Sequence, residues 1–561
     1  MNSARQAQLY RRMLAVGAFF LLIGGLAVAK LASLQGLPAV QALPESDESR
    51  SFEPQRGSIF DAHGYLLAVS TTVYDLAALP ANITDTLSTA GLLSEVLHRP
   101  SLDLLQLLQQ GKTYIRIQRG VSQEQADTIL SWKRSGLQAE PRSTRVYPNG
   151  ALAVCALGFV TESGVASHGI EAKYDDELGG EPGYRVPDRD SMGGLVYRYY
   201  PPHDGVDLYL TLDRNIQHVV EQALERGVRS TMASKGIAVV MDPRTGAILA
   251  MAVLPDYDPN TRIVSDESIF VNSAVSEAYE PGSVFKVITV VSALDAGTIN
   301  ASSTYYDSGE ILVGGRPIRN SDLKAHGETS IRDLLAKSLN VGSATVSGRM
   351  GAKKFYEYLS RFRFGQLTGI DLALETSGWV RMPGNPEWHE SDLATNSYGQ
   401  GLAVTPLQMI SAIAAVANHG VMMRPYVVAR QVDGSQVTEV SPQVLRQVVS
   451  SEAASEVTDI LVYAAETVAD IVGVSGYSVA GKSGTSEVYT SSGGVDPNET
   501  VASFAGYAPA DDPRFAILVV LDRPQLEHYG TRAAGPVFQE IAEEMLSLMG
   551  VPPDNVRTGN R

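Results

Sequence analysis

The chain has 561 residues, 44% hydrophobic and 19% charged, so it is too long for one ordinary core and two or three domains are expected. Its 45 basic and 62 acidic residues give a net charge of -17, which would repel a phosphate backbone and argues against nucleic acid as a partner. The single cysteine, Cys155, excludes an internal disulfide and a thiolate metal cluster, and we interpret it as a small buried hydrophobe.

An uncharged stretch over residues 13–29 follows three arginines and no acidic residue. At about 1.5 Å per residue it reaches the short end of a membrane-spanning helix, and the arginines orient its N-terminus toward the cytoplasm. We therefore predict a cytoplasmic tail over 1–12, a transmembrane anchor over 13–34 in the plasma membrane, and an extracytoplasmic body. A cleaved signal peptide remains the alternative, because Ala27-Val28-Ala29 fits a small-residue cleavage pattern.

Residues 35–51 contain two prolines and a polar cluster, which is typical of an extended linker. A first exported domain is expected over residues 52–210, with short β-like runs and a helical stretch from Thr86 to Gln110 whose leucines recur every three or four residues. No catalytic pattern occurs in this region.

A second domain is expected over residues 211–549. Asp213 is placed as the N-cap of an amphipathic helix. Turn residues Asp242 to Gly246 then separate two apolar runs, Ile237 to Met241 and Ala247 to Ala252, which predict a hairpin of central strands. Three more strands are expected only at the far end, with mainly helices between: Tyr477 to Thr485, Val501 to Tyr507 and Phe515 to Leu521.

Strands from both ends of a domain with helices between them predict an α+β fold in which the two ends meet in one sheet. A last helix from Pro536 to Met549 begins at a proline and stops at Gly550. Its buried stripe is expected to consist of Val537, Ile541, Met545 and Leu548. Residues 550–561 are expected to be a disordered tail.

Ser283 and Lys286 are placed at i and i+3 after a Pro-Gly pair and before an apolar run that predicts a buried helix. The two side chains therefore share one helical face. A serine hydroxyl needs a base within hydrogen-bond reach to act as a nucleophile. Lysine serves as that base only if burial or a cationic neighbour lowers its pKa.

The same spacing occurs in Ser321-Asp322-Leu323-Lys324, so S-x-x-K alone is a weak signal. This second copy lies in a polar stretch without an apolar helix to bury its lysine, and we interpret it as a surface loop.

Two further motifs follow Ser283 in order: Ser338-Leu339-Asn340 at the end of a predicted helix, and Lys482-Ser483-Gly484-Thr485 on a predicted strand. The combination of S-x-x-K, S-x-N and K-[ST]-G resembles the signature of penicillin-binding proteins and related serine β-lactamases. No H-E-x-x-H helix and no G-x-S-x-G elbow occur, which disfavours zinc hydrolysis and a Ser-His-Asp triad.

The resemblance extends to class B penicillin-binding proteins over roughly residues 52–548. It rests on Arg56-Gly57-Ser58-Ile59-Phe60-Asp61, Gly169-Ile170-Glu171, Tyr398-Gly399-Gln400-Gly401 and Val404-Thr405-Pro406-Leu407-Gln408. It implies a transpeptidase domain with a central antiparallel sheet and helices on both faces, preceded by an elongated α+β pedestal of the penicillin-binding protein dimerisation type. Ala62-His63 departs from a basic residue found in many members.

The resemblance also implies the roles of the site residues. Ser283 would be the acyl-accepting nucleophile, Lys286 its general base, Ser338 a proton relay, Asn340 a contact for the substrate amide, and Lys482 a charge that keeps Lys286 neutral. Lys482, Ser483 and Thr485 would bind the terminal carboxylate, with Ser483, Gly484 and Thr485 as the substrate-binding residues. The backbone N–H groups of Ser283 and Thr485 would form the oxyanion hole. The substrate would be a peptidoglycan stem peptide, β-lactams would acylate the same serine, and no cofactor or metal is implied.

Several alternatives remain open. Residues Ser503 to Pro509 and Leu157 to Val160 are more similar to division-site members than to elongation members, which favours a septal role with an elongation role as alternative. A serine β-lactamase or D,D-carboxypeptidase, and a catalytically dispensable scaffold, are the competing classes. A membrane-embedded glycan polymerase and other division proteins are the implied partners.

Two groups of motif residues are interpreted outside the chemistry. Arg56, Asp61 and Glu171 are expected to form fold-holding ion pairs. Tyr398 to Gly401 is expected to be a loop that lines the cleft.

Overall fold

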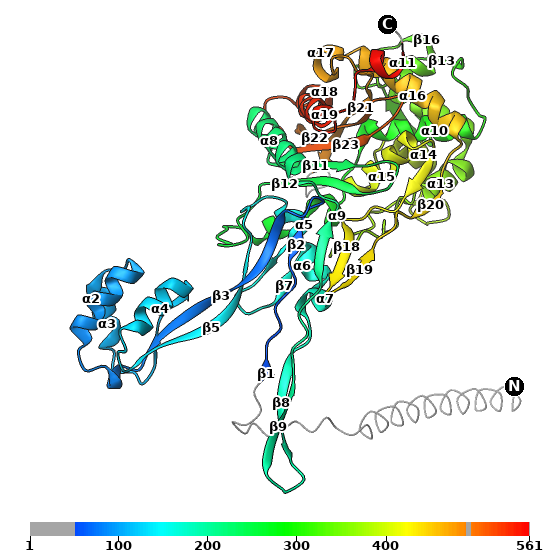
Figure 1. The fold of residues 1–561 in the computed structure, drawn as a ribbon. Coiled ribbons are helices and arrows are strands. Elements are labelled where there is room, and N and C mark those ends of the chain that lie inside the picture. The colour runs from blue at the N-terminus through cyan, green and yellow to red at the C-terminus, as the bar shows by residue number, and fades with distance from the viewer. Residues whose placement is uncertain (1–50, 490–494, 560–561) are drawn as a thin grey trace, which may run out of the picture. The chain divides into compact units, whose positions relative to one another are not determined.

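The computed structural model describes residues 51–489 and 495–559, which form two compact units (Figure 1). One unit contains residues 51–54 and 181–203, and the other contains 55–180 and 204–559. The predicted cytoplasmic tail, membrane anchor and nearly all of the linker lie outside the described residues. Within the described ranges no helix combines the length and apolarity needed to cross a bilayer.

The smaller unit is a three-stranded antiparallel sheet in the order β1-β8-β9. Its strands are β1 (Ser51–Phe52), β8 (Gly183–Arg189) and β9 (Leu195–Tyr200). Phe52 packs edge-on against Tyr199 with ring centroids 5.1 Å apart, while β9 is exposed along its length.

The N-terminal part of the larger unit is built on β3 (Leu66–Ala78), which pairs with β4 (Ile115–Val121) and β5 (Leu137–Val146). The stretch predicted as one helix from Thr86 forms two, α2 (Thr86–Leu97) and α3 (Ser101–Leu108). They separate because His98 adopts a left-handed conformation (φ 53°) and Pro100 lacks the N–H that a continuous helix needs. With α4 (Gln123–Ser131) they cover a small core of their own.

The expected fold-holding ion pairs are present around Glu171, whose side chain is 0% exposed. Arg56 and Arg145 both contact this carboxylate, at 2.8 Å and 2.7 Å. Asp61 instead accepts backbone hydrogen bonds, including one from Tyr65 N at 2.8 Å. Sequence reasoning missed Arg145, although a buried carboxylate requires such partners because removing one leaves an uncompensated charge.

The larger unit contains a five-stranded antiparallel sheet in the order β12-β11-β23-β22-β21. Its strands are β11 (Lys235–Met241), β12 (Ile248–Leu254), β21 (Ala480–Tyr489), β22 (Val495–Ala508) and β23 (Phe515–Asp522). The pairing of β11 with β23 confirms that the two ends of the domain meet in one sheet. The prediction that both hairpin strands are central was wrong for β12, which lies at the edge of this order.

Helices cover both faces of this sheet (Figure 1). Along β11, Ile237, Val239 and Met241 belong to the core that contains α10 (Lys286–Asp295) and α15 (Pro406–Ala417). The alternating residues Ala238 and Val240 belong to the core that contains α8 (Arg214–Thr231) and α19 (Gly535–Leu548). A strand segment buried on both faces must be apolar, which explains the unbroken apolar run from Ile237 to Met241 in β11.

The structure also tests a predicted helix cap, a buried cysteine, a buried helix stripe and a disordered tail. Asp213 caps α8 by accepting hydrogen bonds from two backbone N–H groups, as predicted. Cys155 is buried, as expected. In α19 the predicted stripe is buried except for Leu548, which is 49% exposed. The tail is not disordered as far as residue 559, because α20 (Asp554–Arg557) is held by Arg557, which contacts Asp511 at 2.6 Å.

The remaining elements connect these layers. Those of the N-terminal region are β2 (Ile59–Phe60), α5 (Val154–Leu157), β6 (Phe159–Val160), β7 (Ala166–Ser167), α6 (Gly169–Lys173), α7 (Asp175–Gly179) and β10 (Asp207–Leu210). Those between β12 and β21 are α9 (Ser273–Ser276), β13 (Thr304–Asp307), β14 (Glu310–Val313), β15 (Arg316–Arg319), β16 (Gly327–Ser330), α11 (Ile331–Ala336), α12 (Asn340–Met350), α13 (Ala352–Arg361), α14 (Glu390–Ser397), β17 (Val421–Met423), β18 (Val428–Asp433), β19 (Gln436–Glu439), β20 (Val444–Gln447), α16 (Ser451–Glu466) and α17 (Ala469–Val472). The last short helix is α18 (Gly530–Ala533).

Candidate active site

Ser283 lies in a short 3-10 turn, Gly282–Phe285, that leads directly into α10. Val284 and Phe285 are 0% exposed and anchor this turn in the core, whereas Ser283 remains partly exposed. Lys286 Nζ lies 3.0 Å from Ser283 Oγ, so the i, i+3 spacing does place both groups on one face.

Lys286 is 0% exposed, yet its Nζ has several polar neighbours. Ser338 contributes its carbonyl oxygen at 2.6 Å and its Oγ at 3.3 Å, and Asn340 contributes Oδ1 at 2.8 Å. Burial, and secondly the charge of Lys482, hold the pKa of Lys286 well below its ordinary value. The amine is therefore able to accept a proton near neutral pH.

Ser338 and Asn340 were predicted to lie at the end of one helix. Ser338 instead lies in the break between two helices, and Asn340 begins the second of them. α11 ends at Ala336, Ser338 adopts a left-handed conformation (φ 60°), and α12 begins at Asn340. A left-handed serine is uncommon and requires support from its surroundings. Asn340 Nδ2 donates to Arg319 O at 3.0 Å, which fixes the amide so that its oxygen faces Lys286.

Lys482 lies on β21 and is 4% exposed. Its Nζ donates to Ser483 O at 2.8 Å and lies 3.5 Å from Ser483 Oγ. Burial lowers the pKa of Lys482 to about 7. A lysine in this state is charged below neutral pH and loses that charge above it, so its effect on Lys286 is itself pH-dependent.

Gly484 and Thr485 bring β21 against the Ser283 turn. A Cβ on Gly484 would lie 2.5 Å from Ser503 Oγ and 2.8 Å from Pro281 O, so only glycine permits this approach. Thr485 Oγ1 accepts a hydrogen bond from Gly530 N at 3.0 Å, which ties α18 to the same strand. Ser483 remains partly exposed beside Lys482.

The second S-x-x-K segment is a surface loop, as predicted. Leu323 has φ 57° and is 77% exposed, and Ser321 and Lys324 are exposed too. The segment is therefore not helical, and its lysine is exposed to solvent.

Sequence reasoning missed three contributors to this cluster. Arg319 acts through its backbone carbonyl, which no sequence signal reveals. Gly530 begins the short helix α18 and belongs to none of the motifs recognised in the sequence. Glu280 is three residues before Ser283, and a carboxylate next to a Pro-Gly pair in an otherwise apolar segment is a signal that could have been noticed.

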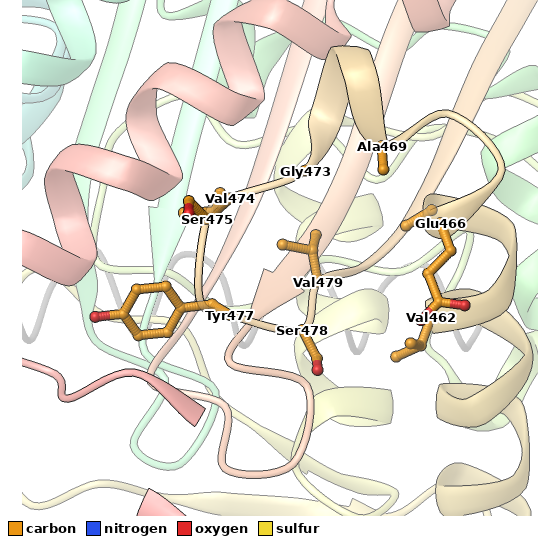
Figure 2. Close-up of a pocket in the computed structure, with 10 residues that line it drawn as sticks. Val462, Glu466, Ala469, Gly473, Val474, Ser475, Tyr477, Ser478 and Val479 are labelled. Carbon is orange, nitrogen blue, oxygen red and sulfur yellow. The ribbon is translucent and has the colours of Figure 1, made fainter. Parts of the chain in front are cut away.

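A separate pocket of about 400 Å³ lies where α16 and α17 meet the chain that enters β21 (Figure 2). In this view Val479 lies between the Tyr477 ring and the Glu466 side chain. None of the predicted site residues lines it. Ser283, Lys286 and Lys482 lie instead around the Ser283 turn, and a serine hydroxyl beside a buried amine is the arrangement that acyl transfer through a serine ester requires.

Two family comparisons match this chain. Residues 236–543 match the penicillin binding protein transpeptidase domain, and residues 51–210 match the penicillin-binding protein dimerisation domain. The two matches lie one after the other along the chain and leave only residues 211–235 between them.

Curated relatives and solved structures agree with these matches. The chain is 32% identical over 520 residues to stage V sporulation protein D of Bacillus subtilis, covering 90% of this chain and 79% of the relative. It is 30% identical over 522 residues to peptidoglycan D,D-transpeptidase FtsI of Escherichia coli, covering 90% and 86%. The crystal structure of penicillin binding protein 3 from Mycobacterium tuberculosis complexed with aztreonam has a TM-score of 0.71 at 26% identity, covering 90% of this chain and 98% of that one.

Proposed function

Since the chain belongs to the class B penicillin-binding proteins, a family of peptidoglycan D,D-transpeptidases, we propose that Ser283 carries the acyl group in its cross-linking reaction. The substrate is a peptidoglycan stem peptide, and β-lactams acylate the same residue. The roles of the surrounding residues follow from the contacts of Lys286.

The observation that carries this proposal is the set of partners around Lys286 Nζ. A neutral amine has two N–H groups and one lone pair. Two neighbours, Ser338 O at 2.6 Å and Asn340 Oδ1 at 2.8 Å, can only accept hydrogen bonds and so take the two N–H groups. The lone pair is then left for the two hydroxyl groups, of which Ser283 Oγ at 3.0 Å is nearer than Ser338 Oγ at 3.3 Å, and Ser283 is where a general base is needed.

Acylation transfers the Ser283 hydroxyl proton to Lys286 while Oγ forms a bond to the carbonyl carbon of the penultimate D-alanine. The bond from that carbon to the nitrogen of the last D-alanine then breaks, and the proton reaches this leaving amine through Ser338 Oγ, 3.3 Å from Nζ. An amine from a second stem peptide takes the acyl group in the reverse sequence and releases Ser283.

Charge stabilisation comes from the strand side of the cluster. The backbone N–H groups of Ser283 and Thr485 bind the developing oxyanion, where one donor typically contributes about 3 kcal/mol to lowering the barrier. Lys482, Ser483 and Thr485 bind the terminal carboxylate, and Gly484 provides the close packing that holds β21 against the nucleophile. Asn340 orients the amine of Lys286 through its Oδ1 atom. Asn340 also contacts the backbone amide of the substrate.

A serine β-lactamase or D,D-carboxypeptidase is the competing activity, in which water rather than an amine resolves the acyl-enzyme. A dispensable scaffold is the competing non-enzymatic role. Both differ from the proposal in the lifetime or the existence of a covalent adduct on Ser283.

Mass spectrometry of the purified extracytoplasmic region after incubation with benzylpenicillin separates the proposal from a β-lactamase and from a scaffold. The expected result is a long-lived adduct on a peptide that contains Ser283, lost in Ser283→Ala and retained in Ser321→Ala, the matched control. Intact drug without an adduct would support the scaffold. Rapidly opened drug without an accumulated adduct would indicate a β-lactamase.

We further propose that the protein acts in septal wall synthesis. The support is the similarity of Ser503 to Pro509 and Leu157 to Val160 to division-site members. The elongation-type alternative needs a direct test. A functional fluorescent fusion is expected at the division site, and a signal spread along the side wall would contradict the septal role.

The N-terminal residues 1–34 are proposed to anchor the protein in the plasma membrane with the catalytic domain outside. The support is the uncharged stretch after three arginines. Protease added to intact spheroplasts should digest the catalytic domain and spare a tag at residue 1, whereas release of the protein into the medium would indicate cleavage. A membrane-embedded glycan polymerase is the proposed partner, and its failure to crosslink to the anchored protein in cells would contradict that pairing.

A further inference from the structure

The segment before Ser283 runs alongside the Tyr398–Gly401 loop region. Tyr279 and Val404 exchange two backbone hydrogen bonds, each 2.9 Å long. Gly282 N donates to Gly399 O at 3.1 Å. The backbone that immediately precedes the nucleophile is therefore attached at two points to the chain around residues 399–404.

Glu280 makes a third attachment with its side chain. Pro281 has no N–H, so a regular backbone ladder cannot continue through this segment. The Glu280 Oε1 atom accepts a hydrogen bond from Gly401 N at 2.9 Å and so satisfies a backbone donor on the opposite chain. Its Oε2 atom is buried and has no hydrogen-bond partner in the described part of the chain.

The contact at Gly399 makes this arrangement sensitive to small movements. Gly399 has φ +80°, and a Cβ there would lie 2.2 Å from Gly282 O. The loop backbone thus touches the backbone of the residue next to Ser283. A displacement of the loop would move Gly282, and with it the Ser283 N–H that binds the oxyanion in the proposed reaction.

The carboxyl group is placed where its ionisation has a cost. Burial raises the pKa of Glu280 to about 7, and the charge of Glu487 on β21 acts in the same direction. Two groups oppose this, the Gly401 N–H and the charge of Arg316 on β15. A buried carboxylate oxygen without a partner is unfavourable when charged, so ionisation favours a looser arrangement in which Oε2 reaches water.

We propose that Glu280 is a positioning residue for acylation of Ser283, whose neutral carboxyl group holds the Gly399–Gly401 loop against the nucleophile turn and whose ionisation loosens that contact. The inference rests on the proposed function, because it concerns the geometry of the same oxyanion site. It assigns to Glu280 a role through Gly401 and Gly282, without contact between Glu280 and the substrate.

The test is the second-order rate constant of acylation by a fluorescent penicillin between pH 5.5 and 8.5, for wild type and Glu280→Gln. Glutamine reproduces the neutral carboxyl group and cannot ionise. The expected ratio of variant to wild-type rates is near one below pH 6 and rises about three- to tenfold above pH 8, the size of effect that a slight misplacement produces. A ratio that does not depend on pH would mean a merely structural role and would overturn the inference.

The melting temperature supplies a second readout with a defined sign. A carboxyl group whose folded pKa is about 7 stabilises the fold relative to an ordinary glutamate below about pH 4.5 and loses this contribution as the pH rises toward 7. The melting temperature of wild type should therefore fall relative to that of Glu280→Gln between pH 5 and 8. Parallel curves would also count against the inference.

Glu487→Gln provides a control that leaves Glu280 intact and is decisive if Glu280→Gln does not fold. Removing the charge of Glu487 should move the pH midpoint at which the acylation rate constant changes to lower pH. Arg316→Gln should move the same midpoint to higher pH. Unchanged midpoints in both variants would overturn the inference. Failure of wild type to be labelled at any pH would instead contradict the proposed function.

Discussion

Two segments of this chain share the spacing S-x-x-K and differ in almost every physical respect. In the first, Lys286 is 0% exposed and its Nζ lies 3.0 Å from Ser283 Oγ. In the second, Ser321 and Lys324 are exposed in a loop in which Leu323 has φ 57°. The spacing puts two side chains on one face only if the segment is helical, and only the first segment is.

Burial of the lysine is the main physical difference between the two segments. Desolvation and the charge of Lys482 lower the pKa of Lys286, whereas Lys324 is exposed to solvent. The hydrophobic residues between serine and lysine, Val284 and Phe285, hold the turn in the core and so keep Lys286 buried. The first two of the following predictions change equivalent positions of the two segments, and the third changes the neighbouring Lys482.

The largest difference is expected for the lysines. Lys286→Met removes the proposed base and should slow acylation by a β-lactam by about 10²- to 10⁴-fold, the usual contribution of general-base catalysis. Lys324→Met should leave the rate unchanged. The measurement is the rate constant for labelling by fluorescent penicillin. A loss below tenfold in Lys286→Met, or an equal loss in Lys324→Met, would show that burial of the first lysine is not what matters.

Substitutions of the residue directly before each lysine should differ nearly as much between the two segments, in their effect on stability rather than on the rate of acylation. Phe285 is 0% exposed, and Phe285→Ala should lower the free energy of unfolding by about 3–5 kcal/mol through lost burial and a residual cavity. Leu323 is 77% exposed, and Leu323→Ala should change it by less than about 0.5 kcal/mol. Denaturant titration of both variants checks this, and similar midpoints for the two would contradict the assigned burial.

Much of the cluster could be predicted because its signals are local. The Ser283–Lys286 pair needs only a helical turn followed by an apolar run, and the Asp213 cap needs only the residues beside it. The absence of such a run after Lys324 correctly marked that segment as a loop. The apolar hairpin strands were recognised for the same reason.

What could not be predicted depends on partners distant in sequence. Asn340 is fixed by the carbonyl of Arg319, and Arg145 completes the ion pairs of Glu171 from 26 residues away. The edge position of β12 was missed because helix coverage makes an edge strand as apolar as a central one. The order of the tail was missed because Asp511, which holds Arg557, lies in a loop distant in sequence.

The smallest difference is expected from the second lysine of the buried cluster. Lys482 has a folded pKa of about 7 and an unfolded pKa of about 10.4, so between these values the unfolded chain binds a proton that the folded chain does not. Stability should therefore rise with pH through this window, and its deficit is greatest below pH 7. Lys482→Met removes this part of the rise, while Lys286 retains its own contribution. Between pH 6 and 9 the melting temperature of the variant should rise about 2–4 °C less than that of wild type, and Lys324→Met should follow wild type. Equal slopes in wild type and Lys482→Met would mean that Lys482 keeps its proton in the folded protein and would place the source of the low pKa of Lys286 in burial together with a permanent neighbouring charge.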